Sequence, residues 1–155
     1  MKKICLVSSS GGHLEQLRQL KIITEKYDSF YVVPKSKSTI NMNDKKYFVD
    51  DLNRNNKIGY ILGIFKMFYQ AFKIMKNEKP DIVISTGAGA AIPICIICKI
   101  FRKKLIYIES FARIDTPNKT GKLLYYFADL FIIQWEELRS YYPKAVYGGW
   151  IYWFL

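Results

Sequence analysis

Residues 81–108 read DIVISTGAGAAIPICIICKIFRKKLIYI, and this stretch decides the fold class. An apolar run at Asp81–Ser85 is followed by glycines, by a long apolar segment at 90–101 and by a second β-rich run at Leu105–Ile108. A short strand, a helix and another short strand of this kind form a βαβ unit, in which the two strands run parallel. Strands that are apolar along their whole length are typical of a sheet covered on both faces.

The same alternation continues in both directions along the chain. Further strands are predicted at Ile4–Ser8, Phe30–Val33, Tyr47–Val49, Leu130–Gln134 and Ala145–Tyr147. Helices are predicted over Leu14–Ile23, Ile58–Met75 and 120–128, with a short helical piece at 135–141, and the polar segments 35–46 and 113–119 are predicted loops. We therefore expect an α/β fold, a Rossmann-like parallel sheet with helices on both faces.

Length and composition favour one domain. The 155 residues are half hydrophobic, which excludes a disordered chain, and 24 Lys and Arg against 13 Asp and Glu give a net charge of +11. We expect a single domain over residues 1–149 and an apolar tail over 150–155. A two-domain enzyme with its own donor and acceptor domains does not fit this length.

The cysteines and the N-terminus indicate a reduced protein without a signal peptide or a membrane-spanning helix. Cys5, Cys95 and Cys98 lie within apolar runs and are predicted to be packing residues, and we expect neither a metal nor a cofactor. Met1-Lys2-Lys3 leads directly into the first strand, which predicts no signal peptide. The longest uncharged stretch, Ile82–Cys98, is shorter than the roughly 20 apolar residues of a membrane span.

Three segments rich in glycine or polar residues directly follow predicted strands, and ligands bind at that edge of open parallel sheets. The first segment holds Ser10, Gly11, Gly12 and His13, where glycine geometry and the first amides of a helix favour a phosphate or diphosphate. Neither the GxGxxG nor the P-loop spacing is present. His13, the single histidine, is a candidate general base or hydrogen-bond donor, or it only caps or packs the helix.

The other two segments supply the remaining candidates. Thr86, Gly87 and Gly89 form a second potential amide-lined site, or the glycines only allow the helix to pack on the sheet. Glu109 ends an apolar strand and is a candidate base or ligand for sugar hydroxyls if it emerges into a cleft. Its alternative role is an N-cap or an ion pair with Arg113.

The predicted helix at 58–76 carries more apolar surface than packing on a sheet requires. Its aromatic residues and lysines suit insertion at an anionic membrane surface, although a thick core-facing helix with snorkelling lysines fits the same pattern. The residues predicted to contact the membrane are Phe65, Lys66, Phe68, Tyr69, Phe72 and Lys73.

The net charge and the C-terminus leave two questions open. A charge of +11 suits nucleic acid or anionic lipid, and we prefer the membrane because no nucleic-acid-binding motif is present. The alternative function is a basic nucleotide- or nucleic-acid-binding Rossmann domain. The diglycine Gly148-Gly149 suggests that the apolar tail swings away from the domain, to dock on a partner or pack on this chain. The tail residues concerned are Trp150, Ile151, Tyr152, Trp153 and Phe154.

Taken in order, five segments carry a resemblance to a known family. They are Ser9–His13, Ser85–Pro93, Ile108–Arg113, Ala128–Phe131 and Gln134–Leu138. The chain resembles the acceptor-binding, membrane-recruiting subunits of bipartite glycosyltransferases, the PssD-type proteins of bacterial exopolysaccharide and capsule synthesis. These subunits are related to a eukaryotic dolichol-pathway subunit and correspond to the N-terminal half of MurG-like GT-B enzymes. The resemblance covers essentially the whole chain.

The resemblance implies a division of labour between two chains. This chain would hold a polyprenyl-diphosphate-linked sugar at the cytoplasmic face of the membrane as a peripheral protein, while a small partner brings the nucleotide sugar. The diphosphate would lie near Gly11, Gly12 and His13, with a second contact near Thr86, Gly87 and Gly89. Glu109 and Arg113 would face the acceptor sugar, and His13 or Glu109 would be the base for inverting attack without a metal. The tail would engage the partner.

Overall fold

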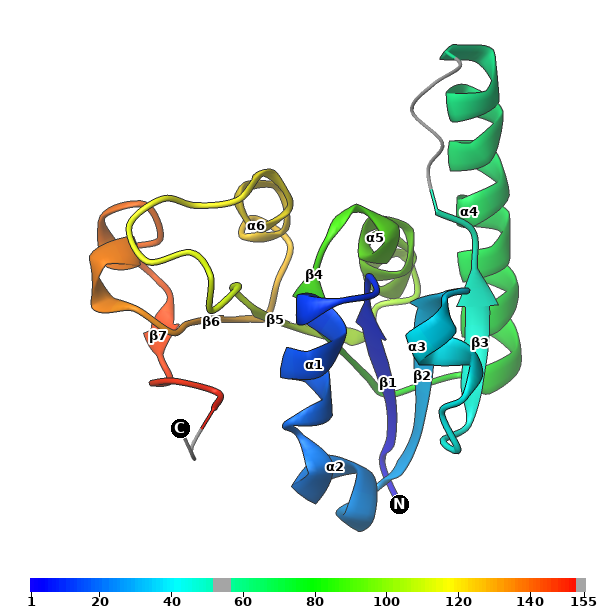
Figure 1. The fold of residues 1–155 in the computed structure, drawn as a ribbon, viewed down its shortest axis with the longest axis horizontal. Helices are drawn as coiled ribbons and strands as arrows, with labels where there is room; N and C mark the ends of the chain where they lie inside the picture. Colours follow the sequence, from blue (N-terminus) through cyan, green and yellow to red (C-terminus); the bar gives the residue numbers. More distant parts are fainter. Residues whose placement is uncertain (52–56, 153–155) are drawn as a thin grey trace.

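A computed structural model describes residues 1–51 and 57–152. Over these residues seven strands form one sheet in the order β3-β2-β1-β4-β5-β6-β7, and every neighbouring pair is parallel (Figure 1). The strands are β1 (Lys3–Ser8), β2 (Asp28–Pro34), β3 (Lys46–Val49), β4 (Ile82–Gly87), β5 (Lys104–Ile108), β6 (Leu130–Ile133) and β7 (Val146–Tyr147). The predicted Rossmann-like parallel sheet is confirmed.

Helices cover both faces of this sheet. They are α1 (Gly12–Arg18), α2 (Lys21–Lys26), α3 (Lys37–Ile40), α4 (Lys57–Glu78), η1 (Gly89–Ala91), α5 (Ile92–Ile100), α6 (Lys119–Leu124) and η2 (Glu136–Ser140). Side chains of α4, α5 and α6 form one apolar core with the sheet, and α1 forms a second core on the opposite face. Alternate residues of β1 enter the two cores: Cys5 and Val7 the first, Ile4 and Leu6 the second.

The structure corrects several predicted boundaries. The helix predicted after β1 is two short helices, with the break at Gln19 and Leu20. The predicted loop at 35–46 contains the short helix α3, which Ser36 caps by accepting a hydrogen bond from the backbone N–H of Thr39. Thr86 and Gly87 belong to β4 and not to the turn that follows it.

Helix α4 is the longest element and extends past the carboxyl ends of the strands (Figure 1). Its second half is anchored by Ala71, Ile74 and Met75, which are buried in the core that the helix shares with the sheet and α5. Among the described residues, no helix has both the length and the hydropathy that a membrane crossing requires.

Candidate functional site

The site forms where the sheet reverses its strand order. From β1 the chain passes to β2 on one side and, after β3, to β4 on the other, so that β1 and β4 are neighbours. The turns after these two strands diverge there and leave a crevice, the usual ligand site of an open parallel sheet. A cleft of about 760 Å³ opens at this place. It is lined by His13, Tyr60, Ala88, Gly89, Ile92, Ser110, Ala112, Arg113, Asn118, Lys119, Thr120 and Leu123.

His13 borders the cleft and is held by two hydrogen bonds to the end of β4. Its Nδ1 lies 2.6 Å from the carbonyl oxygen of Thr86, and the Thr86 hydroxyl donates to the His13 carbonyl at 2.7 Å. A carbonyl oxygen can only accept, so Nδ1 carries the hydrogen and the neutral ring keeps its lone pair on Nε2.

Burial lowers the pKa of His13 from its ordinary 6.5, the Thr86 bond opposes this shift, and the charge of Arg113 adds to it. The ring is therefore neutral at pH 7. A neutral imidazole in a fixed tautomer beside a cleft is suited to accept a proton.

The glycine turn lies between β1 and α1, directly before His13. Gly11 is the residue before α1 and adopts a φ of +77°, which side-chain-bearing residues rarely adopt. Gly11 and Gly12 are exposed and Ser10 is half-buried. None of these three predicted residues is among those that line the cleft, and His13 is the member of this segment that does. The first N–H groups of a helix have no partner inside that helix, so the turn offers donors next to His13 in the chain.

The end of β4 and the turn that follows it contribute differently from the prediction. Thr86 and Gly87 are buried, and the Thr86 hydroxyl is already engaged by His13. A Cβ on Gly87, whose φ is +94°, would lie 3.1 Å from the Tyr107 hydroxyl and 3.3 Å from Cε1 of His13. Gly87 therefore gives the His13 ring room to pack, whereas Gly89 lines the cleft.

Glu109 does not emerge into the cleft, so the expected exposure of this carboxylate is wrong. The residue has no exposed surface, and its Oε1 accepts hydrogen bonds from the Ser110 N–H at 2.8 Å and from the Asn118 side chain. The Tyr142 hydroxyl donates to Oε2 at 2.8 Å. Burial raises the pKa of Glu109, and these hydrogen bonds oppose that shift.

Through these contacts Glu109 fixes the wall of the cleft. Asn118 caps α6, where its Oδ1 accepts from the Gly121 N–H at 2.6 Å, and Glu109 holds the other end of the same side chain. Asn118 itself lines the cleft. Glu109 follows β5 directly, but its carboxylate is bound by Ser110, Asn118 and Tyr142, and the residue is not among those that line the cleft.

The basic side chains that line the cleft are His13, Arg113 and Lys119, and none of the described lining residues carries a carboxylate. Arg113, a predicted site residue, is exposed. Sequence reasoning missed Tyr60, Asn118 and Lys119. Asn118 was detectable, because an asparagine before a helical segment is an N-cap signal. Tyr60 was not, because α4 reaches the cleft only in the folded structure.

The predicted membrane-contacting residues divide into two groups. Phe65, Tyr69 and Phe72 are exposed at helical spacing on α4, and Ile61 and Leu62 extend the same apolar surface. Phe68 is half-buried and packs against the core, so it exposes less of its ring than the other aromatic residues of this set. Lys66 is exposed and pairs with Asp50 at 2.7 Å, and Lys73 is exposed.

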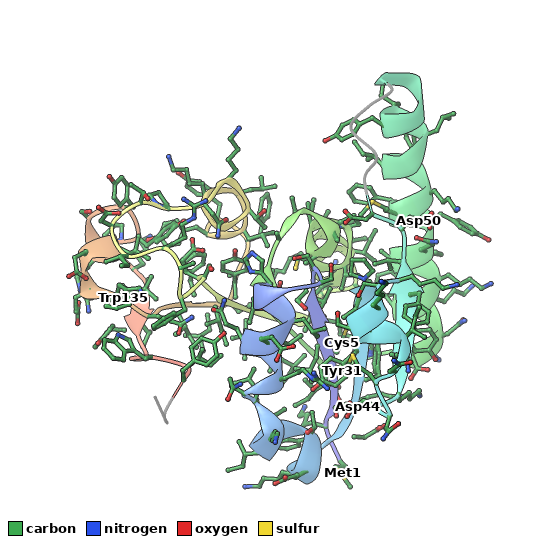
Figure 2. All side chains as sticks on the ribbon, viewed as in Figure 1. Met1, Cys5, Tyr31, Asp44, Asp50 and Trp135 are labelled. Carbon is green, nitrogen blue, oxygen red and sulfur yellow. The ribbon has the colours of Figure 1, made fainter. Side chains whose placement is uncertain are left out.

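The described part of the tail lies on the domain and does not swing away from it. The Ile151 N–H donates to Oε1 of Gln134 at 2.8 Å. The rings of Trp150 and Tyr152 pack with those of Phe111 and Trp135, and Figure 2 places Trp135 on the side of the molecule opposite α4. Half of the Trp150 surface, 51%, is still exposed. Trp153 and Phe154 lie outside the described residues.

Comparison with solved structures confirms the fold. MurG from Acinetobacter baumannii matches with a TM-score of 0.75 and 16% identity over 88% of this chain and 43% of that enzyme. UDP-N-acetylglucosamine 2-epimerase from Rickettsia bellii matches with a TM-score of 0.72 and 14% identity over 92% of this chain and 41% of that one. The chain thus spans less than half of either structure, and the likeness at these identities concerns the fold.

Sequence comparison identifies the family. The human UDP-N-acetylglucosamine transferase subunit ALG14 is 27% identical over 94% of this chain and 81% of its own length. The subunit from Yarrowia lipolytica is 27% identical over 95% of this chain and 80% of its own. These relatives confirm the resemblance to a eukaryotic transferase subunit, whereas the PssD-type assignment stays a prediction. The family model "Oligosaccharide biosynthesis protein Alg14 like" matches residues 4–151, and the chain belongs to this family.

Proposed function

We propose that this chain is the acceptor-binding subunit of a two-chain, inverting glycosyltransferase. One observation carries the proposal: the cleft at the β1–β4 switch point is lined by Arg113, Lys119 and a neutral His13, without a carboxylate among its described lining residues. Such a lining attracts an anion and still offers a base. Membership in a family whose curated relatives are named transferase subunits supports the same conclusion.

The acceptor that fits this cleft is a sugar linked to a polyprenyl diphosphate. Its diphosphate would lie between the glycine turn at Gly11 and Gly12 and the cations Arg113 and Lys119, because exposed N–H groups and fixed positive charges both stabilise phosphate oxygens. Gly89 would allow close approach of the ligand to the backbone, since nothing lies within 4 Å of a Cβ placed there.

His13 is the proposed base. As the hydroxyl oxygen of the acceptor sugar attacks the anomeric carbon of the donor, its proton passes to Nε2 of His13, a glycosidic bond forms, and the bond from the anomeric carbon to the nucleotide diphosphate breaks. The resulting imidazolium shares its Nδ1 proton with the Thr86 carbonyl, which stabilises the positive charge. Attack from the face opposite the leaving group inverts the configuration. Glu109 takes no proton here and positions the loop that carries Arg113.

The donor is proposed to reach the site on a separate, small nucleotide-sugar-binding chain. The aromatic cluster of Phe111, Trp135, Trp150 and Tyr152 is the proposed docking surface, with Ile151, Trp153 and Phe154 from the same tail. Its support is the exposure of Trp150 at the edge of a cluster that adjoins the loop leading to Arg113.

The membrane contact is proposed to be the outer face of α4. An apolar stripe is formed on α4 by the exposed residues Phe65, Tyr69 and Phe72, and its contact with water is unfavourable. The exposed Lys66 and Lys73 on the same helix would attract anionic lipid headgroups. We propose a peripheral position at the cytoplasmic face of the cell membrane. The narrower assignment to exopolysaccharide or capsule synthesis is proposed on the sequence resemblance alone.

Reconstitution tests the function directly. The purified chain and its candidate donor-binding partner are mixed with a nucleotide sugar and a short polyprenyl-diphosphate-linked sugar, and transfer is followed by mass of the product. We expect transfer only with both chains present. Full turnover by this chain alone, or tight salt-sensitive binding of single-stranded DNA with no binding of the acceptor, would contradict the proposal.

Vesicle sedimentation tests the membrane contact. Replacing Phe65 and Tyr69 by serine should reduce binding to vesicles containing anionic phospholipid by about tenfold or more, since each change removes a large exposed apolar side chain. The matched control replaces Phe48 and Tyr126, which are aromatic and exposed on other elements. Equal losses in both double variants would refute a specific role for α4.

A further inference from the structure

Two buried glutamines join the C-terminal tail to the walls of the cleft. Gln16 on α1 and Gln134 after β6 are 4% and 1% exposed, and Nε2 of Gln134 donates to Oε1 of Gln16 at 2.9 Å. The two residues are 118 positions apart in the chain. Buried amide side chains must find partners for their donors and acceptors, so the partners of this pair show what it connects.

On one side the pair holds the tail. Oε1 of Gln134 accepts the hydrogen bond from the Ile151 N–H at 2.8 Å, and the second donor of its Nε2 reaches the Glu109 carbonyl at 2.8 Å. The Gln134 amide thus contacts the tail, the Glu109 carbonyl directly after β5 and Gln16 on α1. A shift of Ile151 therefore moves Gln134.

On the other side the pair holds the cleft. Oε1 of Gln16 also accepts from the Phe111 N–H at 2.9 Å, and its Nε2 donates to the Gly12 carbonyl at 3.4 Å. The Phe111 carbonyl accepts from Nε1 of Trp135 at 2.7 Å. Both backbone groups of Phe111 are thus fixed, one by the glutamine pair and one by the aromatic cluster. Ala112 and Arg113, the next two residues, line the cleft.

We propose that Gln16 and Gln134 are positioning residues that couple the seating of residues 150–152 to the position of the loop carrying Arg113. The bonds form one connected path from the Ile151 N–H through both amides to the Phe111 N–H. When residues 150–152 are seated, the backbone of Phe111 is held in place, and this fixes the chain two residues before Arg113. When they are displaced, Gln134 loses the hydrogen bond that it accepts from the Ile151 N–H, and Phe111 is held less firmly. The inference rests on the proposed function, because a partner that docks on the tail would then change the position of Arg113 in the acceptor cleft.

Amide hydrogen exchange measured by NMR tests the coupling without any ligand. Ile151→Pro removes the N–H that binds Gln134, and Ile151→Ala is the matched control that keeps it. We expect exchange of the Phe111 N–H to be about threefold to tenfold faster in Ile151→Pro than in Ile151→Ala. Gln134→Met should produce a similar acceleration, whereas Gln19→Met, a change to an exposed glutamine directly after α1, should produce none.

The double variant Ile151→Pro with Gln134→Met should exchange no faster at Phe111 than Gln134→Met alone, because both changes break one path. The coupling would be overturned if the two changes multiplied each other's effect on the exchange rate of the Phe111 N–H, or if Ile151→Pro left that rate unchanged. Should Ile151→Pro fail to fold, the path is tested from its other end: Gln16→Met must accelerate exchange of the Ile151 N–H, which Gln16 does not contact, and an unchanged rate overturns the proposal.

A second readout separates this inference from the proposed function. Farnesyl diphosphate is titrated into the full chain, and its affinity should fall about threefold to tenfold in Ile151→Pro and Gln134→Met relative to their controls. Unchanged affinity in both variants would show that the path stops short of the cleft and overturn the inference. If the unaltered chain does not bind this probe while the Phe111 coupling is observed, the proposed function fails and the coupling stands.

Discussion

The two sides of the cleft differ in whether the titratable residue at the strand end reaches the opening. His13, on the β1 side, borders the opening, whereas Glu109, on the β5 side, has no exposed surface. Burial favours the neutral form of both residues, since it lowers the pKa of His13 and raises that of Glu109. Yet Glu109 has all its hydrogen bonds inside the protein, while the Nδ1 bond of His13 leaves Nε2 for a substrate.

The difference shows that position after a strand does not by itself make a residue catalytic. On the β1 side the chain turns directly into α1 and presents His13 at the edge. On the β5 side the chain forms a loop before α6, and the residue at the strand end becomes the support of that loop. We therefore propose that proton transfer belongs to the β1 side and positioning to the β5 side, and four predictions test this division.

The largest effect is expected for His13→Asn. The asparagine amide can still donate to the Thr86 carbonyl, but it cannot accept a proton. We expect turnover of the reconstituted pair to fall about 10²- to 10⁴-fold, the usual cost of losing a general base, with partner binding unchanged. A loss below about tenfold would remove His13 from the chemistry.

Glu109 should respond to the kind of substitution. Glu109→Ala leaves the Asn118 and Tyr142 donors without their acceptor and should lower the free energy of unfolding by roughly 2–4 kcal/mol. Glu109→Gln can accept from Ser110 and Asn118 and donate to the Tyr142 hydroxyl, so its turnover should stay within about tenfold of the unaltered pair. Denaturant titration and steady-state rates measure both. Loss of turnover in a stably folded Glu109→Gln would instead make this residue the base.

Gly121 tests the packing around Glu109. A Cβ at this position would meet the Glu109 carboxylate and lie 2.7 Å from the Tyr142 hydroxyl. Gly121→Ala should therefore reduce stability by about 1–3 kcal/mol through overpacking, although alanine favours helices elsewhere. Thermal unfolding of the variant measures this cost. A stabilised variant would mean that the β5 side is looser than described.

The smallest effect concerns the pKa of His13, which its ring-proton NMR signal reports directly because the chain has one histidine. The titration midpoint should lie below 6.5, and turnover should fall as the pH drops through it. Arg113→Met should move the midpoint to higher pH, because the Arg113 charge lowers this pKa. Folding stability should also fall below pH 6.5, since the unfolded chain then binds a proton that the folded ring resists. A midpoint at or above 6.5 would contradict the described burial.

Much of the fold was readable from local patterns, because buried parallel strands are uniformly apolar. Ile4–Val7 and Leu105–Ile108 are such runs, and both are strands. The break between α1 and α2 was not readable, since Leu14, Leu17 and Leu20 continue one helical face across it. The Rossmann-like arrangement follows once the strands and helices are placed in alternation.

The cleft residues that could be predicted are those that follow the carboxyl ends of the strands, where an open parallel sheet binds its ligands. His13, Gly89 and Arg113 were found in this way. The burial of Glu109 depends on Asn118 and Tyr142, which lie 9 and 33 residues further along the chain. The Thr86 hydroxyl is engaged by a residue 73 positions away. The seating of Ile151 on Gln134 likewise depends on contacts that no local pattern encodes.

We propose that this cleft takes a diphosphate-linked acceptor and not the nucleotide-sugar donor. NMR titration of the purified chain with a farnesyl-diphosphate-linked sugar, and separately with UDP-N-acetylglucosamine, distinguishes the two ligands. We expect the first ligand to shift the amide signals of His13, Gly89 and Arg113 and the second to leave them unchanged. Binding of the nucleotide sugar at these residues, with no response to the lipid-linked sugar, would contradict it.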